Sequence, residues 1–308
     1  MRTLISALSL HKPASRLLGA AALILLASGV LHLAVNLAVS GHWTGPISLR
    51  KPITFAFSVG MLLWTVGWVI DRMPSRPRLE KILGRTLAVS SLVEVGLITV
   101  QAWRGVPSHF NLSTPEDGII FGLMGVSVIF MSLTLVATTV CAFRQPPVEP
   151  GLRLAVRAGM LLIVAGLGVG QWMIELGNDF FEQFDRVPDR VLAGAAGAPT
   201  FPHAMGFHGI QVFILAALLA GLLGLEVRAA QRVVRLVVAG YSVLLVWSIV
   251  QAASGGAPLD LFRPALVLAL IGIGLLVAPA GLLVVGGRRS TAPEIPDAQQ
   301  QTPVPSAR

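Results

Sequence analysis

The chain has 308 residues, of which 54% are hydrophobic and only 12% are charged. A soluble domain carries roughly 25% charged residues, so this composition excludes an ordinary soluble protein and makes the lipid bilayer the expected main partner. The net charge of +8 comes from cations scattered between apolar runs, whereas binding to nucleic acid would need clustered cations, so no nucleic-acid partner is expected.

The N-terminal region predicts a membrane helix that the mature protein retains. Arg2, Lys12 and Arg16 precede an apolar run from Leu17 to about Val39. This run is longer than the roughly 7–15 residues of a secretory signal core, and it continues through polar side chains. We therefore expect residues 1–16 to form a cytoplasmic segment and expect no cleaved signal peptide.

Eight segments are long and apolar enough to cross a membrane. A spanning helix needs about 20 mainly apolar residues, because roughly 30 Å of hydrocarbon is crossed at about 1.5 Å per residue. The sequence therefore predicts an all-α, polytopic bundle that forms one domain over residues 17–286. The eight predicted spans are 17–39, 53–71, 83–103, 117–142, 154–177, 204–226, 234–252 and 264–286.

The distribution of Lys and Arg predicts the orientation of these spans. One set of connections, together with the N-terminal segment and the two arginines just after the last span, holds sixteen of these cations, and the opposite set holds six. Cationic connections stay in the cytoplasm, so both termini are expected there. Residues 287–308 are rich in Pro, Gln and small polar residues, and they predict a disordered cytoplasmic tail.

The remaining polar residues concentrate in the predicted outer halves of the spans. His32 and Asn36 lie four residues apart, on one helix face, and Glu94 lies near the middle of the third span. Glu175 and His208 come from the fifth and sixth spans. Because such groups are unfavourable in hydrocarbon, they are expected to face each other or water. The sequence thus predicts one polar pocket that is open to the extracytoplasmic side.

This pocket suggests first a membrane-embedded enzyme or redox protein that depends on haem or a divalent metal. His32 and His208 would bind the cofactor, as haem ligands or together with Glu175 as ligands of a metal ion. Glu94 and Glu175 would act as catalytic acid and base. The substrate would contact polar side chains that lie near the same end of the spans, namely Asn36, Gln101, Arg104, Gln171 and Gln211.

Two other functions fit the same residues. In a proton-coupled transporter, Glu94 and Glu175 would bind protons and the glutamines would contact a small polar solute. In a non-catalytic assembly protein, the polar residues would only fasten the helices together. Motifs that bind nucleotides or form soluble hydrolase sites are missing, and the single Cys141 excludes a site of several thiolates.

Three local patterns in the sequence are also informative. Thr114-Pro115-Glu116-Asp117 predicts a helix start, with Thr114 as N-cap and two acids in the first turn, so these acids are left out of the site. Gln101-Ala-Trp-Arg-Gly-Val-Pro resembles Gln251-Ala-Ala-Ser-Gly-Gly-Ala-Pro, but a match this short is as consistent with chance. The loop Ser48-Leu-Arg-Lys-Pro is of a kind common in bacterial inner-membrane proteins and identifies no named family.

Overall fold

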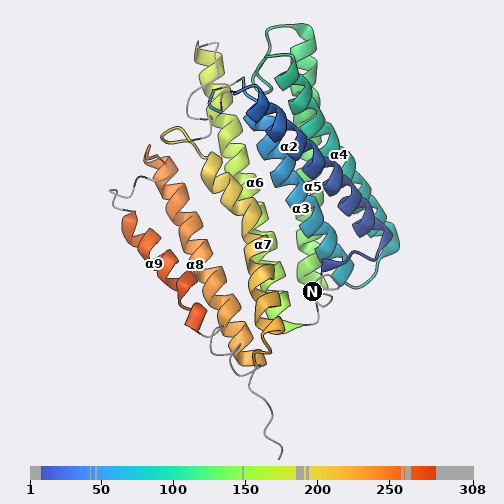
Figure 1. Cartoon of the computed structure of the whole chain (residues 1–308), viewed down its shortest axis with the longest axis vertical. Coiled ribbons are helices and arrows are strands. Elements are labelled where there is room, and N and C mark those ends of the chain that lie inside the picture. The colour runs from blue at the N-terminus through green and yellow to red at the C-terminus, as the bar shows by residue number, and fades with distance from the viewer. Residues whose placement is uncertain are drawn as a thin grey trace, which may run out of the picture.

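The computed structural model is an all-helical bundle (Figure 1). It describes residues 8–41, 43–45, 47–147, 149–184, 191, 194–257, 260 and 265–281. Within these ranges the long helices are α2 (Pro13–Ala38), α3 (Arg50–Arg72), α4 (Pro77–Trp103), α5 (Pro115–Arg144), α6 (Pro150–Phe184), α7 (Thr200–Leu222), α8 (Val227–Ala253) and α9 (Leu266–Val277). The predicted tail at residues 287–308 lies outside the described residues.

Proline and glycine set many of the helix boundaries. The first residue of α2, α4, α5 and α6 is a proline, whose fixed φ suits the first helical position and whose missing N–H is not needed there. Left-handed glycines follow the ends of α4, α7 and α8, namely Gly105, Gly224 and Gly255. At these positions the chain can turn sharply and satisfy the last carbonyl groups of the helix.

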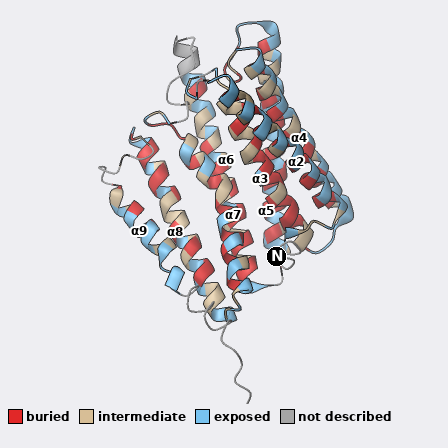
Figure 2. Ribbon diagram, viewed as in Figure 1, coloured by how far each residue is buried: buried red, intermediate tan, exposed pale blue. Residues whose placement is uncertain are grey.

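Seven of the described helices are long and apolar enough to cross a membrane, which is the architecture of a multi-pass membrane protein. They coincide with the first seven predicted spans to within several residues. Many large apolar residues are exposed, as expected of a surface in contact with lipid. Figure 2 shows exposed residues along the helices of the bundle. The eighth predicted span, 264–286, corresponds to α9, a helix of 12 residues, and residues 282–286 lie outside the described part.

The helices pack as two sets of four neighbours in the chain. In the first set α2 packs on α3 and α4, and α5 packs on α4; in the second set α6 packs on α7 and α8, and α9 packs on α8. The sets meet where α5 contacts α6 and α3 contacts α7. We call the two ends of the bundle the Lys12 end, where α2 begins, and the Trp103 end, where α4 finishes.

Candidate functional site

His32 is held by two local partners inside the first set of helices. Its ring is buried, with 4% of the residue exposed. Its Nδ1 lies 2.7 Å from the Ser28 carbonyl oxygen, and its Nε2 accepts a hydrogen bond from Trp103 Nε1 at 2.9 Å. Because the indole N–H can only donate, Nδ1 carries the ring proton and donates it to Ser28. Both ring nitrogens are therefore occupied, and neither is free to bind iron or another metal.

Gln101 and Arg104, two predicted substrate contacts, meet Asp117 at the Trp103 end. Asp117 Oδ1 accepts hydrogen bonds from Gln101 Nε2 at 2.9 Å and from Arg104 Nη1 at 2.6 Å. Arg104 Nη1 also donates to Gln101 Oε1. Thr114 accepts a bond from the Asp117 N–H, which confirms the predicted N-cap. Asp117 thus has a second role that its place in the first turn did not reveal, namely to join α4 and α5.

His208 and Gln211 lie between α3 and α7, away from His32. His208 Nε2 lies 2.7 Å from Ser58 Oγ, and Gln211 Nε2 donates to Thr65 Oγ1 at 3.1 Å. The oxygen of the Gln211 amide is buried and has no hydrogen-bond partner. These contacts link the two sets of helices between α3 and α7, and a bond from Arg157 Nη2 to the Phe143 carbonyl oxygen links them between α5 and α6.

Glu175 and Gln171 are exposed near the end of α6, and their described bond joins them to each other. Gln171 Nε2 donates to Glu175 Oε1 at 3.3 Å, within one turn of the same helix. Asn36 is buried at the end of α2, and its side-chain oxygen has no partner. Neither Glu175 nor Asn36 contacts His208 through a described hydrogen bond.

Glu94 has the least usual setting of the predicted residues. It is 2% exposed, in the middle of α4, and neither carboxyl oxygen has a hydrogen-bond partner. Ser91 lies three residues earlier on the same helix face, and its buried hydroxyl also lacks a partner. Every other buried carboxyl group in the described part of the chain has a partner, so Glu94 is the exception that needs an explanation.

The loop between α4 and α5 holds a second histidine, which is partly buried. His109 Nδ1 lies 2.9 Å from Ser108 Oγ, which in turn accepts a bond from Lys51 Nζ at 3.3 Å. The His109 ring packs beside the rings of Phe55 and Phe121. Burial and, secondarily, the charge of Lys51 lower the pKa of His109 to about 3, so the ring is neutral in the folded protein.

This neutral ring predicts a pH-dependent stability. Between pH 6.5, the ordinary pKa of His109, and about 3, the unfolded chain binds a proton that the folded chain does not. Stability is therefore complete above this window and falls as the pH drops through it, by up to about 1.4 kcal/mol per pH unit. Thermal unfolding in detergent should show this slope, and His109→Phe should flatten it. Equal slopes in the two proteins would contradict the prediction.

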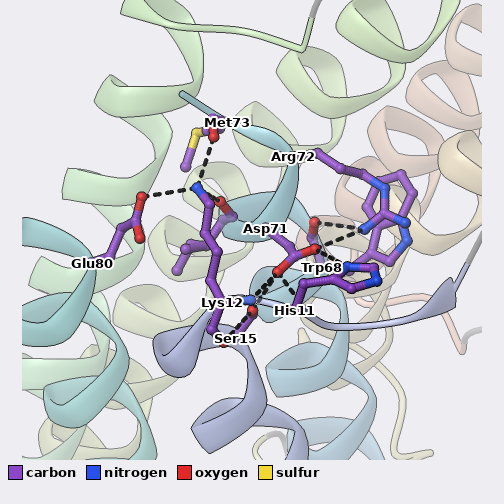
Figure 3. Close-up of polar contacts among 9 residues, drawn as sticks. His11, Lys12, Ser15, Trp68, Asp71, Arg72, Met73 and Glu80 are labelled. Carbon is purple, nitrogen blue, oxygen red and sulfur yellow. Dashed lines mark hydrogen bonds and ion pairs between the residues drawn. The ribbon is translucent and has the colours of Figure 1, made fainter. Parts of the chain in front are cut away.

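Polar contacts gather most densely at the Lys12 end, where the sequence predicted no site (Figure 3). Asp71 Oδ1 accepts hydrogen bonds from the backbone N–H groups of His11 and Lys12, at 2.8 and 2.7 Å, and from Ser15 Oγ at 2.6 Å. Asp71 thus caps the start of α2 from the end of α3. A lone acid beside the arginines that follow the second span was the available sequence signal.

Lys12 in turn binds carbonyl groups at the end of α3. Its ammonium group donates to the carbonyl oxygens of Ile70 and Met73, at 2.9 and 2.7 Å, which are among the last carbonyls of that helix. It also donates to Glu80 Oε1 on α4 at 2.9 Å. We call these residues, His11, Lys12, Ser15, Asp71 and Glu80, the end clamp. Because its bonds run between helix ends, its role is structural.

The four residues proposed to share a pocket, His32, Glu94, Glu175 and His208, lie in four separate settings. None of them lines the hollow beside Ser248 and Gln251 or the hollow beside Lys51 and Ser108, and neither hollow admits a water molecule. Within the described ranges no three His, Cys, Asp or Glu side chains are placed to hold a metal ion, and no described contact brings His32, His208 and Glu175 together. Comparison with protein-family models, curated protein sequences and solved structures finds no match to this chain.

Proposed function

We propose that this protein is a proton-coupled carrier of a small solute in the plasma membrane of a bacterium, and that Glu94 binds the coupled proton. The observation that carries the proposal is the isolation of Glu94, a buried carboxyl group without a partner in the middle of a spanning helix. The carboxyl groups of Asp71, Glu80 and Asp117 are all hydrogen-bonded by neighbouring helices. A purely structural acid would be expected to resemble them.

The isolation of Glu94 links its protonation to a change of conformation. An isolated carboxylate is very unfavourable in a medium of low dielectric constant, so the group is stable here as a neutral acid. It can release its proton only when water or a cation reaches it, which requires the packing around α4 to open. The packing around Glu94 is then closed when the carboxyl group is protonated and open when it is ionised. Proton binding is thereby coupled to a change of conformation.

The other two functions lack a comparable observation. A haem or metal enzyme would need free histidine nitrogens, whereas both nitrogens of His32 are hydrogen-bonded. An assembly protein needs polar residues that fasten helices, as the end clamp does, but this function leaves the unpartnered carboxyl group of Glu94 without a role. The proposed orientation places the Lys12 end in the cytoplasm, because the predicted cytoplasmic connections hold most of the Lys and Arg residues.

Infrared difference spectroscopy tests the proton-binding role of Glu94. The reconstituted protein should show the carbonyl band of a buried carboxylic acid that disappears reversibly at alkaline pH. Glu94→Gln should lose this band, and Glu226→Gln should keep it, because Glu226 is exposed and makes no side-chain cap. Vesicles with an imposed pH gradient should lose solute-dependent proton flux only in Glu94→Gln.

Two results would count against the proposal. If the wild-type band is absent, Glu94 is ionised and the argument from its isolation fails. If the band is present but Glu94→Gln changes only the unfolding temperature, Glu94 serves packing, and the assembly function takes precedence.

A further inference from the structure

The second half of the bundle repeats the helix order of the first, with equal lengths in the two middle pairs, although α6 is longer than α2 and α9 is shorter than α5. α3 and α7 both have 23 residues, and α4 and α8 both have 27. α7 begins 150 residues after α3, and α8 begins 150 residues after α4. The first helix of each set, α2 or α6, begins at a proline, Pro13 or Pro150. Such agreement in length and spacing indicates two copies of one four-helix unit.

Sequence and packing agree with this alignment. Matching the prolines of α2 and α6 pairs identical residues: Arg16 with Arg153, Leu17 with Leu154, Ala21 with Ala158, Leu25 with Leu162 and Gly29 with Gly166. A Cβ atom added at Gly29 would meet Ala56 and Phe57, and one added at Gly166 would meet Gly206 and Phe207. These contacted positions are again 150 residues apart. The same glycine therefore lets the first two helices of each unit approach closely.

The ends of α4 and α8 also repeat. Gly105 has φ 69° and Gly255 has φ 75°. Gly105 N donates to the Ala102 carbonyl oxygen, and Gly255 N donates to that of Ala252, at 3.2 and 3.0 Å. The packing partners within the two sets correspond as well, since α2, α3, α4 and α5 contact one another as α6, α7, α8 and α9 do. Both units begin at the same end of the bundle, so the repeat is parallel.

The equivalent helices α3 and α7 meet at the boundary between the units, which we call the seam. Ser58 and His208 are equivalent by the same 150-residue offset, and they contact each other directly at 2.7 Å. Thr65 and Gln211 make the second polar contact. Ser58 lies eight residues into α3, about 12 Å along the helix, yet it is only partly buried, as are His208 and Gln211.

We propose that the seam is a binding site for a small uncharged solute that donates and accepts hydrogen bonds. The buried Gln211 oxygen lacks a partner and can accept a bond from such a solute. The seam offers hydroxyl, amide and imidazole groups, and residues 53–70 of α3 and all of α7 contain no Asp, Glu, Lys or Arg. A charged solute would therefore find no compensating side chain on these two helices.

This site rests on the proposed function and names where the carrier holds its solute. Carriers built from repeats bind their substrates near the middle of the membrane, at the boundary between the repeats. Here that boundary is closed by two polar contacts and by the packing of α5 on α6. A small rotation of one unit against the other separates Ser58 from His208 and frees both groups for the solute.

Cysteine labelling tests whether the seam is open to water. In a Cys141→Ala background, Ser58→Cys and Gln211→Cys should react with a membrane-impermeant methanethiosulfonate reagent added from one side of the membrane. Two controls should stay unlabelled. Leu31→Cys lies on the outer face of α2, where the residue is 59% exposed, and Leu63→Cys is fully buried on α3. Labelling of the seam cysteines no faster than these controls would overturn the site.

Protection experiments test the class of solute. Erythritol or urea should slow the labelling of Ser58→Cys several-fold, and sodium glutamate should not. Protection by glutamate alone, or by none of the three, would overturn the assignment of an uncharged solute. The labelling does not depend on proton exchange at Glu94. If the seam cysteines are labelled but the infrared band of Glu94 is absent, only the proposed function is refuted. If the band is present but the seam cysteines are not labelled, only the seam is refuted.

Discussion

Asp71→Ala is expected to lower the free energy of unfolding by about 3 kcal/mol, because one substitution removes most of the end clamp. The Asp71 side chain is 6% exposed and accepts hydrogen bonds from His11, Lys12 and Ser15. Without it, the backbone N–H groups before α2 and the Ser15 hydroxyl lose their acceptor. The loss is large because several donors are left unsatisfied together.

Thermal unfolding in detergent, followed by tryptophan fluorescence, measures this effect. Trp68 stacks under Arg72 at 3.8 Å, beside Asp71, so its emission reports on this end of α3. Glu226→Ala is the matched control, since it removes an exposed carboxylate at a helix start that makes no side-chain cap. If the two variants unfold at the same temperature, the clamp does not stabilise the bundle.

Gly206→Ala is expected to destabilise the crossing of α6 and α7 by a similar amount, about 3 kcal/mol or more. A Cβ atom at Gly206 would lie 2.5 Å from Gly166 Cα and 3.0 Å from the Leu162 carbonyl oxygen. Both contacts are with backbone atoms, which cannot rotate away as the tip of a side chain can. The two helices must therefore move apart, and they lose packing along their whole contact.

Gly168→Ala provides the comparison for this second variant. Gly168 lies two residues after Gly166 on the same helix, and a Cβ atom there would meet nothing within 4 Å. Because alanine favours a helix over glycine, Gly168→Ala should leave the unfolding temperature unchanged or slightly raised. A comparable loss of stability in both variants would show that the close approach of Gly206 to α6 is not the cause of the effect.

Local patterns in this sequence predicted local structure well. Apolar length located the seven long helices, and the Thr114 N-cap formed as expected because its partner is only three residues away. The last span is described only in part. α9 ends at Val277, Ala278 keeps helical dihedral angles, and the residues of the predicted span after 281 lie outside the described part.

Partners from other helices were not predictable in the same way. The sequence placed His32 on a helix face but could not show that the face meets Trp103, because helix crossings depend on the packing of the whole bundle. Asp117 was assigned to its helix start alone, and Ser58 received no role. The resemblance of Gln101-Ala to Gln251-Ala was visible but too short to interpret. Its meaning depends on equal helix lengths, which only the fold supplies.

The length of α6 has a practical consequence for imaging this protein. Its 35 residues measure about 52 Å, whereas the hydrocarbon layer is about 30 Å thick, so the helix is longer than one crossing requires. In Figure 1 it rises beyond α7 at the Trp103 end. Images of a small membrane protein in a detergent belt are hard to align, because few features lie outside the belt. A rigid helical fusion continued from α6 would provide such a feature at a fixed angle to the bundle.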